Sequence, residues 1–149
     1  MKQATFYLLD PTDTLPDLAC VLITARYRQG DTLYVHAADG AEAALLDEQL
    51  WQQDTASFVP HALSDEPTVG MAPVEIGHQG PRRARGVLIN LAESVPAFAG
   101  RFTEVIDFVP TDETRKQLAR ERYKQYRAAG FTLQTLPASA AQPSPPEIR

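Results

Sequence analysis

The pattern that most constrains the fold is an alternation between short apolar stretches typical of strands and longer stretches with helical spacing. Residues 4–9 are rich in β-branched and aromatic side chains and end at Asp10-Pro11, a pair that favours a turn. Apolar residues then recur with helical spacing over 15–26, and Gly30 predicts the end of that helix. A second strand is expected over 32–37. The chain therefore begins as a strand, a helix and a strand.

The rest of the chain continues this alternation. Asp39, followed three residues later by Glu42, resembles a capping box and predicts a helix through Trp51. Weaker strand signals lie at 58–59 and 74–76, and clearer strands at 87–91, 104–109 and 131–136, with a helix over 111–130. Strands alternating with helices over 149 residues predict one three-layer α/β/α domain with a mostly parallel, Rossmann-like sheet.

Two segments do not fit the alternation. Residues 137–149 are rich in proline, alanine and serine and carry few large apolar side chains, so we expect a domain over 1–136 and a disordered C-terminal tail. The loop over 77–86 contains Arg82, Arg83 and Arg85, and the sequence assigns no role to it.

No pattern in the chain predicts catalysis, a metal site or a cofactor. Folds of this class often bind nucleotides after the first strand, but residues 9–14 contain no glycine and place Asp10 and Asp13 where a phosphate would lie. The histidines are far apart in sequence, and none has a metal-ligand companion three or four residues away. Cys20 lies among apolar residues, which favours a buried thiol. A nucleotide-binding α/β enzyme is therefore only an alternative interpretation.

The charge of the chain is unevenly distributed. Residues 115–127 hold six of the fourteen Lys and Arg residues and one of the nineteen acidic residues, so this segment carries +5 and the remainder −10. An acidic body repels the phosphate backbone, so direct DNA binding is not expected. No apolar run is long enough to span a membrane or to form a signal peptide, so we expect a soluble, cytoplasmic protein.

The basic segment places one group of side chains on a single helix face. We call this group the basic stripe; its members are Lys116, Arg120, Tyr123, Lys124 and Arg127. Like charges four residues apart are mildly destabilising, so a partner outside the helix is expected to compensate them. Arg122 falls on the opposite, packing face with Leu118, Ala119, Tyr126 and Ala129, where its head group is expected to snorkel or to find a carboxylate. The residues alone leave two interpretations of the stripe open, a solvated helix face or a ridge that binds an acidic peptide.

A second candidate surface lies around Trp51, the only tryptophan. It ends the second expected helix, and Phe58 and Pro60 follow shortly after it. Both aromatic side chains could pack in the core. Alternatively they could anchor a protein partner, because tryptophan is enriched at interface hot spots.

At these residues the chain resembles the chi subunit family of bacterial DNA polymerase III holoenzyme. The likeness is carried by ATFYLLD at 4–10, LDEQLW and SFVPH within 46–61, APVEI at 72–76, and FTEVIDFVP with KQLARERYKQYRAAGF within 102–131. The resemblance implies a three-layer α/β fold without enzymatic activity or cofactor, in an accessory subunit of the clamp-loader assembly.

The resemblance also implies two partners. One is the psi subunit, which would form a heterodimer with this chain and connect it to the clamp-loader complex. The other is the acidic C-terminal tail of single-stranded DNA-binding protein. Matched position by position, the tail site falls on Val109 and the basic stripe, and the psi site falls on Trp51, Phe58 and Pro60.

Overall fold

The computed structural model describes residues 1–53 and 58–141. Their strands are β1 (Gln3–Leu8), β2 (Leu33–His36), β3 (His61–Leu63), β4 (Val74–Gly77), β5 (Val87–Asn90), β6 (Glu104–Val109) and β7 (Thr132–Pro137). The α-helices are α1 (Leu15–Arg28), α2 (Gly40–Trp51) and α3 (Glu113–Ala128). Three short 3₁₀ helices complete the described elements: η2 (Pro67–Met71), η3 (Ala99–Arg101) and η4 (Ala138–Ala141).

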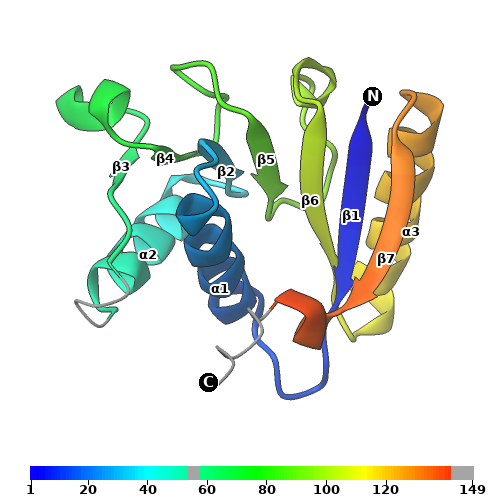
Figure 1. The fold of residues 1–149 in the computed structure, drawn as a ribbon. Coiled ribbons are helices and arrows are strands. Elements are labelled where there is room, and N and C mark those ends of the chain that lie inside the picture. The colour runs from blue at the N-terminus through cyan, green and yellow to red at the C-terminus, as the bar shows by residue number, and fades with distance from the viewer. Residues whose placement is uncertain (54–57, 142–149) are drawn as a thin grey trace, which may run out of the picture.

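The strands form one sheet in the order β3-β4-β2-β5-β6-β1-β7, in which adjacent strands run parallel (Figure 1). Parallel strands need crossover connections. Helices α1, α2 and α3 link β1 to β2, β2 to β3 and β6 to β7, and segments that contain η2 and η3 link β3 to β4 and β5 to β6. The prediction of an α/β domain with a mostly parallel sheet is confirmed.

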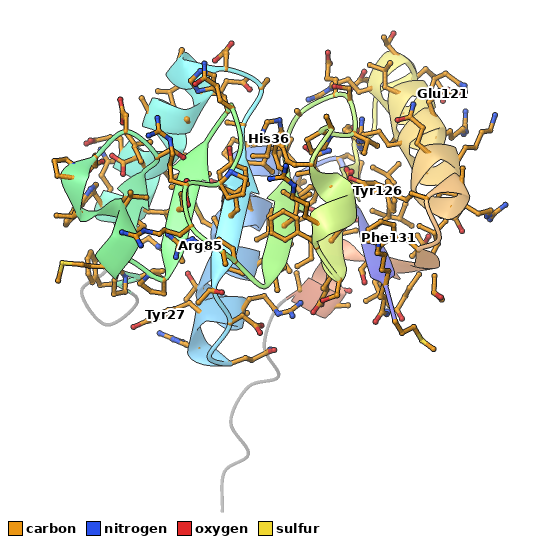
Figure 2. The ribbon with its side chains drawn as sticks, turned by 90° about the horizontal axis from the view of Figure 1, so that it is seen from above. Tyr27, His36, Arg85, Glu121, Tyr126 and Phe131 are labelled. Atoms are coloured by element: carbon orange, nitrogen blue, oxygen red, sulfur yellow. The ribbon has the colours of Figure 1, made fainter. Side chains whose placement is uncertain are left out.

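Helices cover both faces of the sheet, so the domain has three layers. Alternate residues of one strand point to opposite faces: Leu33 and Val35 pack in the core beneath α1 and α2, whereas Tyr34 packs in the core on the side of α3. Figures 1 and 2 show α1 and α3 on opposite sides of the sheet. In Figure 2, Tyr126 lies on the inner side of α3 and Glu121 on its outer side.

The strand expected at 58–59 is displaced. The structure places β3 at His61–Leu63, where it pairs with β4 in a register that begins at His61 and Val74. Phe58 and Val59 therefore lie before the first pair of this register, because β4 itself begins at Val74. Val59 is nevertheless buried, and Phe58 lies at the surface.

The expected start of the C-terminal tail is also wrong. β7 extends to Pro137, and η4 follows directly. Ala138 and Ala141 are buried in the core cluster that contains the residues of α1, because small side chains allow this backbone to lie close to the helix. Residues 137–141 thus belong to the domain, and the remainder of the expected tail, 142–149, lies outside the described residues.

The arginine-containing loop is tied to the sheet. Glu75 of β4 is fully buried and forms an ion pair of 3.3 Å with Arg85, while the backbone N–H of Arg82 donates to the same carboxylate over 2.7 Å. Arg85 also donates to the carbonyl oxygens of Val69 and Ala72 at 2.9 and 2.5 Å. Arg85 therefore has a structural role, whereas Arg82 and Arg83 are exposed.

Candidate protein-binding surfaces

The helix that carries the basic stripe is capped at both ends. The side chain of Asp112 accepts a hydrogen bond from the backbone N–H of Arg115 over 2.9 Å. The negative charge of Glu113 in the first turn interacts favourably with the positive end of the helix dipole. At the other end Gly130 adopts φ +95°, and the Phe131 N–H donates to the carbonyl of Tyr126 over 3.0 Å. This left-handed cap stops the helix before β7.

The stripe lies along one flank of α3, between the buried face of the helix and its fully exposed side. Arg120, Lys124 and Arg127 are exposed, and Lys116 and Tyr123 are half-buried. The ring of Tyr123 packs against Phe6 of β1 with 5.4 Å between ring centroids. The guanidinium of Arg127 lies 5.1 Å from the centre of the Tyr123 ring, a cation–π contact. Tyr123 therefore joins the charged surface to the core.

Acidic residues of the same helix compensate part of the charge on the stripe. The sequence had led us to expect compensation by a partner outside the helix. Lys116 lies 3.7 Å from Glu113, and Lys124 lies 3.5 Å from Glu121. Exposed ion pairs of this kind are worth about 0–1 kcal/mol and are screened by salt. Arg120 makes a hydrogen bond of 3.2 Å to Gln117, and in the described part of the chain it has no ion pair. Its charge remains available to a ligand.

An apolar patch lies beside the stripe at the carboxyl ends of β1 and β6. Val109 is half-buried, and it packs against the same core cluster as Tyr123. Leu8 is 43 % exposed and pairs with Val109 in the strand register. By strand alternation Leu8 shares a face with Phe6, the side covered by α3. Sequence reasoning missed Leu8, although its spacing from Ala4 and Phe6 indicated this face.

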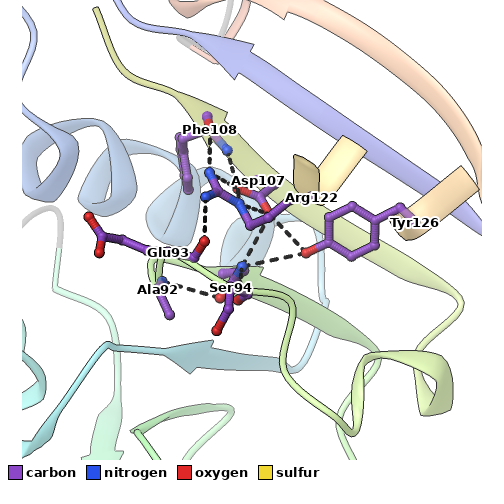
Figure 3. A network of polar contacts seen from close by, with 8 residues as sticks. Ala92, Glu93, Ser94, Asp107, Phe108, Arg122 and Tyr126 are labelled. Atoms are coloured by element: carbon purple, nitrogen blue, oxygen red, sulfur yellow. Dashed lines mark hydrogen bonds and ion pairs between the residues drawn. The ribbon is translucent and has the colours of Figure 1, made fainter. Parts of the chain in front are cut away.

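The inner side of α3 is held by a buried polar network, shown in Figure 3. Arg122 places Nε 3.1 and 3.2 Å from the two carboxylate oxygens of Asp107, and donates to the carbonyls of Glu93 and Phe108 at 2.9 and 3.0 Å. The Tyr126 hydroxyl donates to Asp107 over 2.8 Å, and the Asn90 amide donates to it over 3.1 Å. The expectation that Arg122 finds a carboxylate is confirmed.

This network holds α3 against the sheet and so determines the direction in which the basic stripe faces. Burial raises the pKa of Asp107, and the neighbouring Arg122 charge opposes that rise. Burial, followed by the charge of Asp107, raises the pKa of Tyr126. Ala119, Arg122 and Tyr126 are the buried residues of α3, and two of them, Arg122 and Tyr126, belong to this network. Ala129, expected on the packing face, is exposed because it caps the helix near its end.

The second candidate surface consists of aromatic rings at the end of α2. Trp51 is 57 % exposed and Phe58 is 42 % exposed, with 5.3 Å between their ring centroids. His61 lies beneath them, with 5.1 Å between the centroids of its ring and the Trp51 ring. Its Nδ1 lies 2.7 Å from the Val59 carbonyl oxygen, and its Nε2 lies 3.3 Å from the Asp47 carboxylate. Pro60 is half-buried. We call Trp51, Phe58 and Pro60 the aromatic cluster; its two rings lie at the surface rather than in the core.

The turn between β1 and α1 has the chemistry expected from its sequence. The backbone N–H of Asp10 donates to the carboxylate of Asp13 over 2.7 Å, and Thr14 caps α1 by accepting from the Asp17 N–H over 3.3 Å. Two acidic side chains thus lie beside the helix N-terminus at which a Rossmann fold binds phosphate. A phosphate there would meet charge repulsion.

Neither a metal site nor a membrane-spanning helix is found in the described part of the chain. Among residues 1–53 and 58–141, no three His, Cys, Asp or Glu side chains are grouped so that they could hold a metal ion. In the same ranges, no helix is long and apolar enough to cross a membrane.

Comparison with known proteins identifies a family. The model of the family described as DNA polymerase III chi subunit, HolC, matches residues 1–134. The DNA polymerase III subunit chi of Escherichia coli strain K12 is 47 % identical over 143 residues, covering 91 % of this chain and 97 % of the relative. The subunit chi of Haemophilus influenzae is 44 % identical, with 90 and 96 % covered, and that of Pseudomonas aeruginosa is 36 % identical, with 90 and 95 % covered. The chain therefore belongs to the DNA polymerase III chi subunit family.

Proposed function

We propose that this chi-family chain is a non-catalytic, cytoplasmic adaptor in DNA replication with two protein-binding surfaces. The basic stripe, with Val109 and Leu8 beside it, binds the acidic C-terminal tail of single-stranded DNA-binding protein. The aromatic cluster binds the psi subunit, through which the chain joins the clamp-loader complex. Family membership supports the accessory role in replication, and the two surfaces support the assignment of partners.

The observation that carries the tail assignment is a cationic ridge beside an exposed apolar patch. Carboxylates of an acidic peptide would form charge-assisted hydrogen bonds with Arg120 and Lys116, which are stronger than neutral ones. The family resemblance implies that this tail ends in a phenylalanine, whose ring would contact Leu8, Val109 and Tyr123. A disordered peptide loses conformational entropy on binding, so an affinity in the micromolar range, about −8 kcal/mol, is expected.

The same surface is poorly suited to bare DNA. Outside 115–127 the chain carries a net charge of −10, and Tyr123 is the one aromatic residue of the stripe on which a base could stack. We therefore expect contact with DNA to be indirect, through the protein that coats it. Many copies of the tail on a coated strand would raise the avidity.

The psi assignment rests on two large apolar side chains at the surface. Partly exposed Trp and Phe rings in contact with each other are typical of interface anchors. The hydrogen bond between His61 and the Val59 carbonyl, and the 3.3 Å contact of His61 with the Asp47 carboxylate, support the cluster from below. A partner that covers Trp51 and Phe58 would bury apolar surface at little ordering cost, because these rings already pack against each other.

The tail assignment is tested with the variant Arg120→Ala. Arg120 is exposed and contacts Gln117, so its loss should change the free energy of unfolding by no more than about 0.5 kcal/mol. Loss of a hydrogen bond to a charged group, worth about 1.5–3 kcal/mol, should weaken tail-peptide binding by roughly ten- to a hundredfold. Calorimetry with a synthetic tail peptide measures this.

A matched control separates site-specific loss from a general charge effect. Arg83→Ala removes the same charge from the exposed loop between β4 and β5, where the Arg83 guanidinium lies beside Gly70 of η2. Its affinity for the peptide should stay within about twofold of the unmodified chain. Equal losses in both variants, or an unchanged affinity in Arg120→Ala, would remove the basis for this site.

A further inference from the structure

A large cavity opens at the carboxyl ends of β2, β5 and β6. Its volume is about 780 Å³, and it lies between the N-terminus of α1 and the side of α2. Volumes of 300–1,000 Å³ are typical of ligand sites, and open parallel sheets bind ligands at this edge. Neither surface described above uses this cavity.

The walls of the cavity are largely apolar. Leu15, Leu46, Leu91 and Phe108 line it, together with Leu45 of α2. Leu45 is 70 % exposed, more than either ring of the aromatic cluster. A leucine exposed to this extent at the edge of an apolar hollow offers contact area that a partner could cover.

The charges around the cavity favour a cationic ligand. Both arginines that line it are paired, Arg115 with Asp112 at 2.6 Å and Arg122 with Asp107, as Figure 3 shows for the latter. Three carboxylates at the cavity, those of Glu42, Glu48 and Glu93, make no ion pair within the described residues. An apolar group next to a Lys or Arg would be complementary, and a phosphate or an acidic peptide would be repelled.

The cavity is continuous with the aromatic cluster along α2. Leu45, Glu48 and Trp51 are three residues apart in turn and all exposed, so they form an oblique row across the outer surface of the helix. With 1.5 Å of rise per residue, Leu45 lies about 9 Å along the axis from Trp51. The next residue, Gln52, itself lines the cavity. A single partner segment can therefore span both features.

We infer that the cavity at Leu45 is a second docking site for the partner that binds the aromatic cluster, and that it takes an apolar side chain with a Lys or Arg beside it. This inference rests on the proposed psi surface. It extends that surface from two aromatic rings to a continuous strip along α2, from the aromatic cluster to Leu45. The carboxylates of Glu42, Glu48 and Glu93 supply its specificity.

Two variants of the full chain test the inference by calorimetry with purified psi. Leu45→Glu places a charge in the apolar hollow and should weaken psi binding at least tenfold. The triple variant Glu42→Gln, Glu48→Gln and Glu93→Gln keeps the shape but removes the charge. It should weaken binding at low salt and reduce the dependence of affinity on salt concentration. Met71→Glu is the control for Leu45→Glu, because Met71 is 88 % exposed and lies in η2, outside the cavity.

The outcomes separate this inference from the proposed function. Unchanged psi affinity and salt dependence in both cavity variants, with binding lost in Trp51→Ala, would overturn the cavity site and leave the aromatic cluster intact. Unchanged affinity in Trp51→Ala would overturn the proposed psi surface itself. If Leu45→Glu unfolds, the conservative triple variant decides alone. In methyl NMR spectra, addition of psi should shift the signals of Leu45 and Leu91, and static signals would contradict the inference.

Discussion

Replacing Arg122 with methionine should destabilise the domain by about 3–5 kcal/mol, the usual cost of removing one partner of a buried ion pair. Arg122 and Asp107 are almost completely shielded from solvent, with 6 and 0 % of their side chains exposed. Methionine keeps helix propensity and apolar length, so the loss comes from the polar contacts. The variant leaves Asp107 without its counter-charge and the carbonyls of Glu93 and Phe108 without their donor.

The loss should also depend on pH. Arg122 opposes the rise in the pKa of Asp107 that burial causes, so its removal should raise that pKa further. A carboxyl group whose folded-state pKa lies above its unfolded value favours the folded state at low pH. It loses that advantage as the pH rises through the folded-state pKa. The stability difference between the unmodified chain and Arg122→Met should therefore be smaller at pH 5 than at pH 8.

Urea unfolding at both pH values measures these differences. Arg120→Met is the matched control, since it makes the same substitution two residues earlier on the exposed side of α3 and should change stability by no more than about 0.5 kcal/mol. A loss below about 1 kcal/mol in Arg122→Met, or one that is larger at pH 5, would refute this description of the network.

Three further predictions concern other parts of the domain. Gly130→Ala should lower the free energy of unfolding in urea by about 1 kcal/mol, because φ is +95° at this position. The control Gly100→Ala, at a position without a positive φ, should lower it less, and equal losses would contradict the capping argument. Burial raises the pKa of Cys20 to about 11, so a thiol reagent at pH 8 should react much faster in urea than with the native chain, and equal rates would contradict burial. Trp51→Ala should weaken psi binding roughly thirtyfold with nearly unchanged tail-peptide affinity; loss of both would indicate misfolding.

The order of strands and helices could be predicted from the sequence because each long element has a clear period and a clear stop. Gly30 and Gly130 end α1 and α3 with positive φ, and Asp39 caps α2 by accepting from the Glu42 N–H over 2.8 Å. β3 could not be placed, because three residues carry too little periodicity and its position is set by the register with β4. Nor could η4, whose alanines are buried only because α1 lies beside them.

Only those parts of the candidate sites whose residues lie close together in sequence could be predicted. The stripe lies on one helix, so its residues could be grouped from the sequence alone. The partner of Arg122 could be expected to be a carboxylate, but Asp107 is fifteen residues away and only the sheet brings the two together. Leu8 and Val109 meet through the register of β1 and β6. The cavity at Leu45 is lined from several separate segments, and no local pattern indicates it.

The central claim, one chain with two separate partner surfaces, is tested most directly by measuring tail-peptide affinity with and without saturating psi. The stripe lies on α3 and the aromatic cluster at the end of α2, at opposite ends of the sheet in Figure 1. The affinity of the peptide should therefore be the same within about twofold in both states, and a ternary complex should form. Competition, with the peptide displaced by psi or bound at least tenfold more weakly, would contradict the claim.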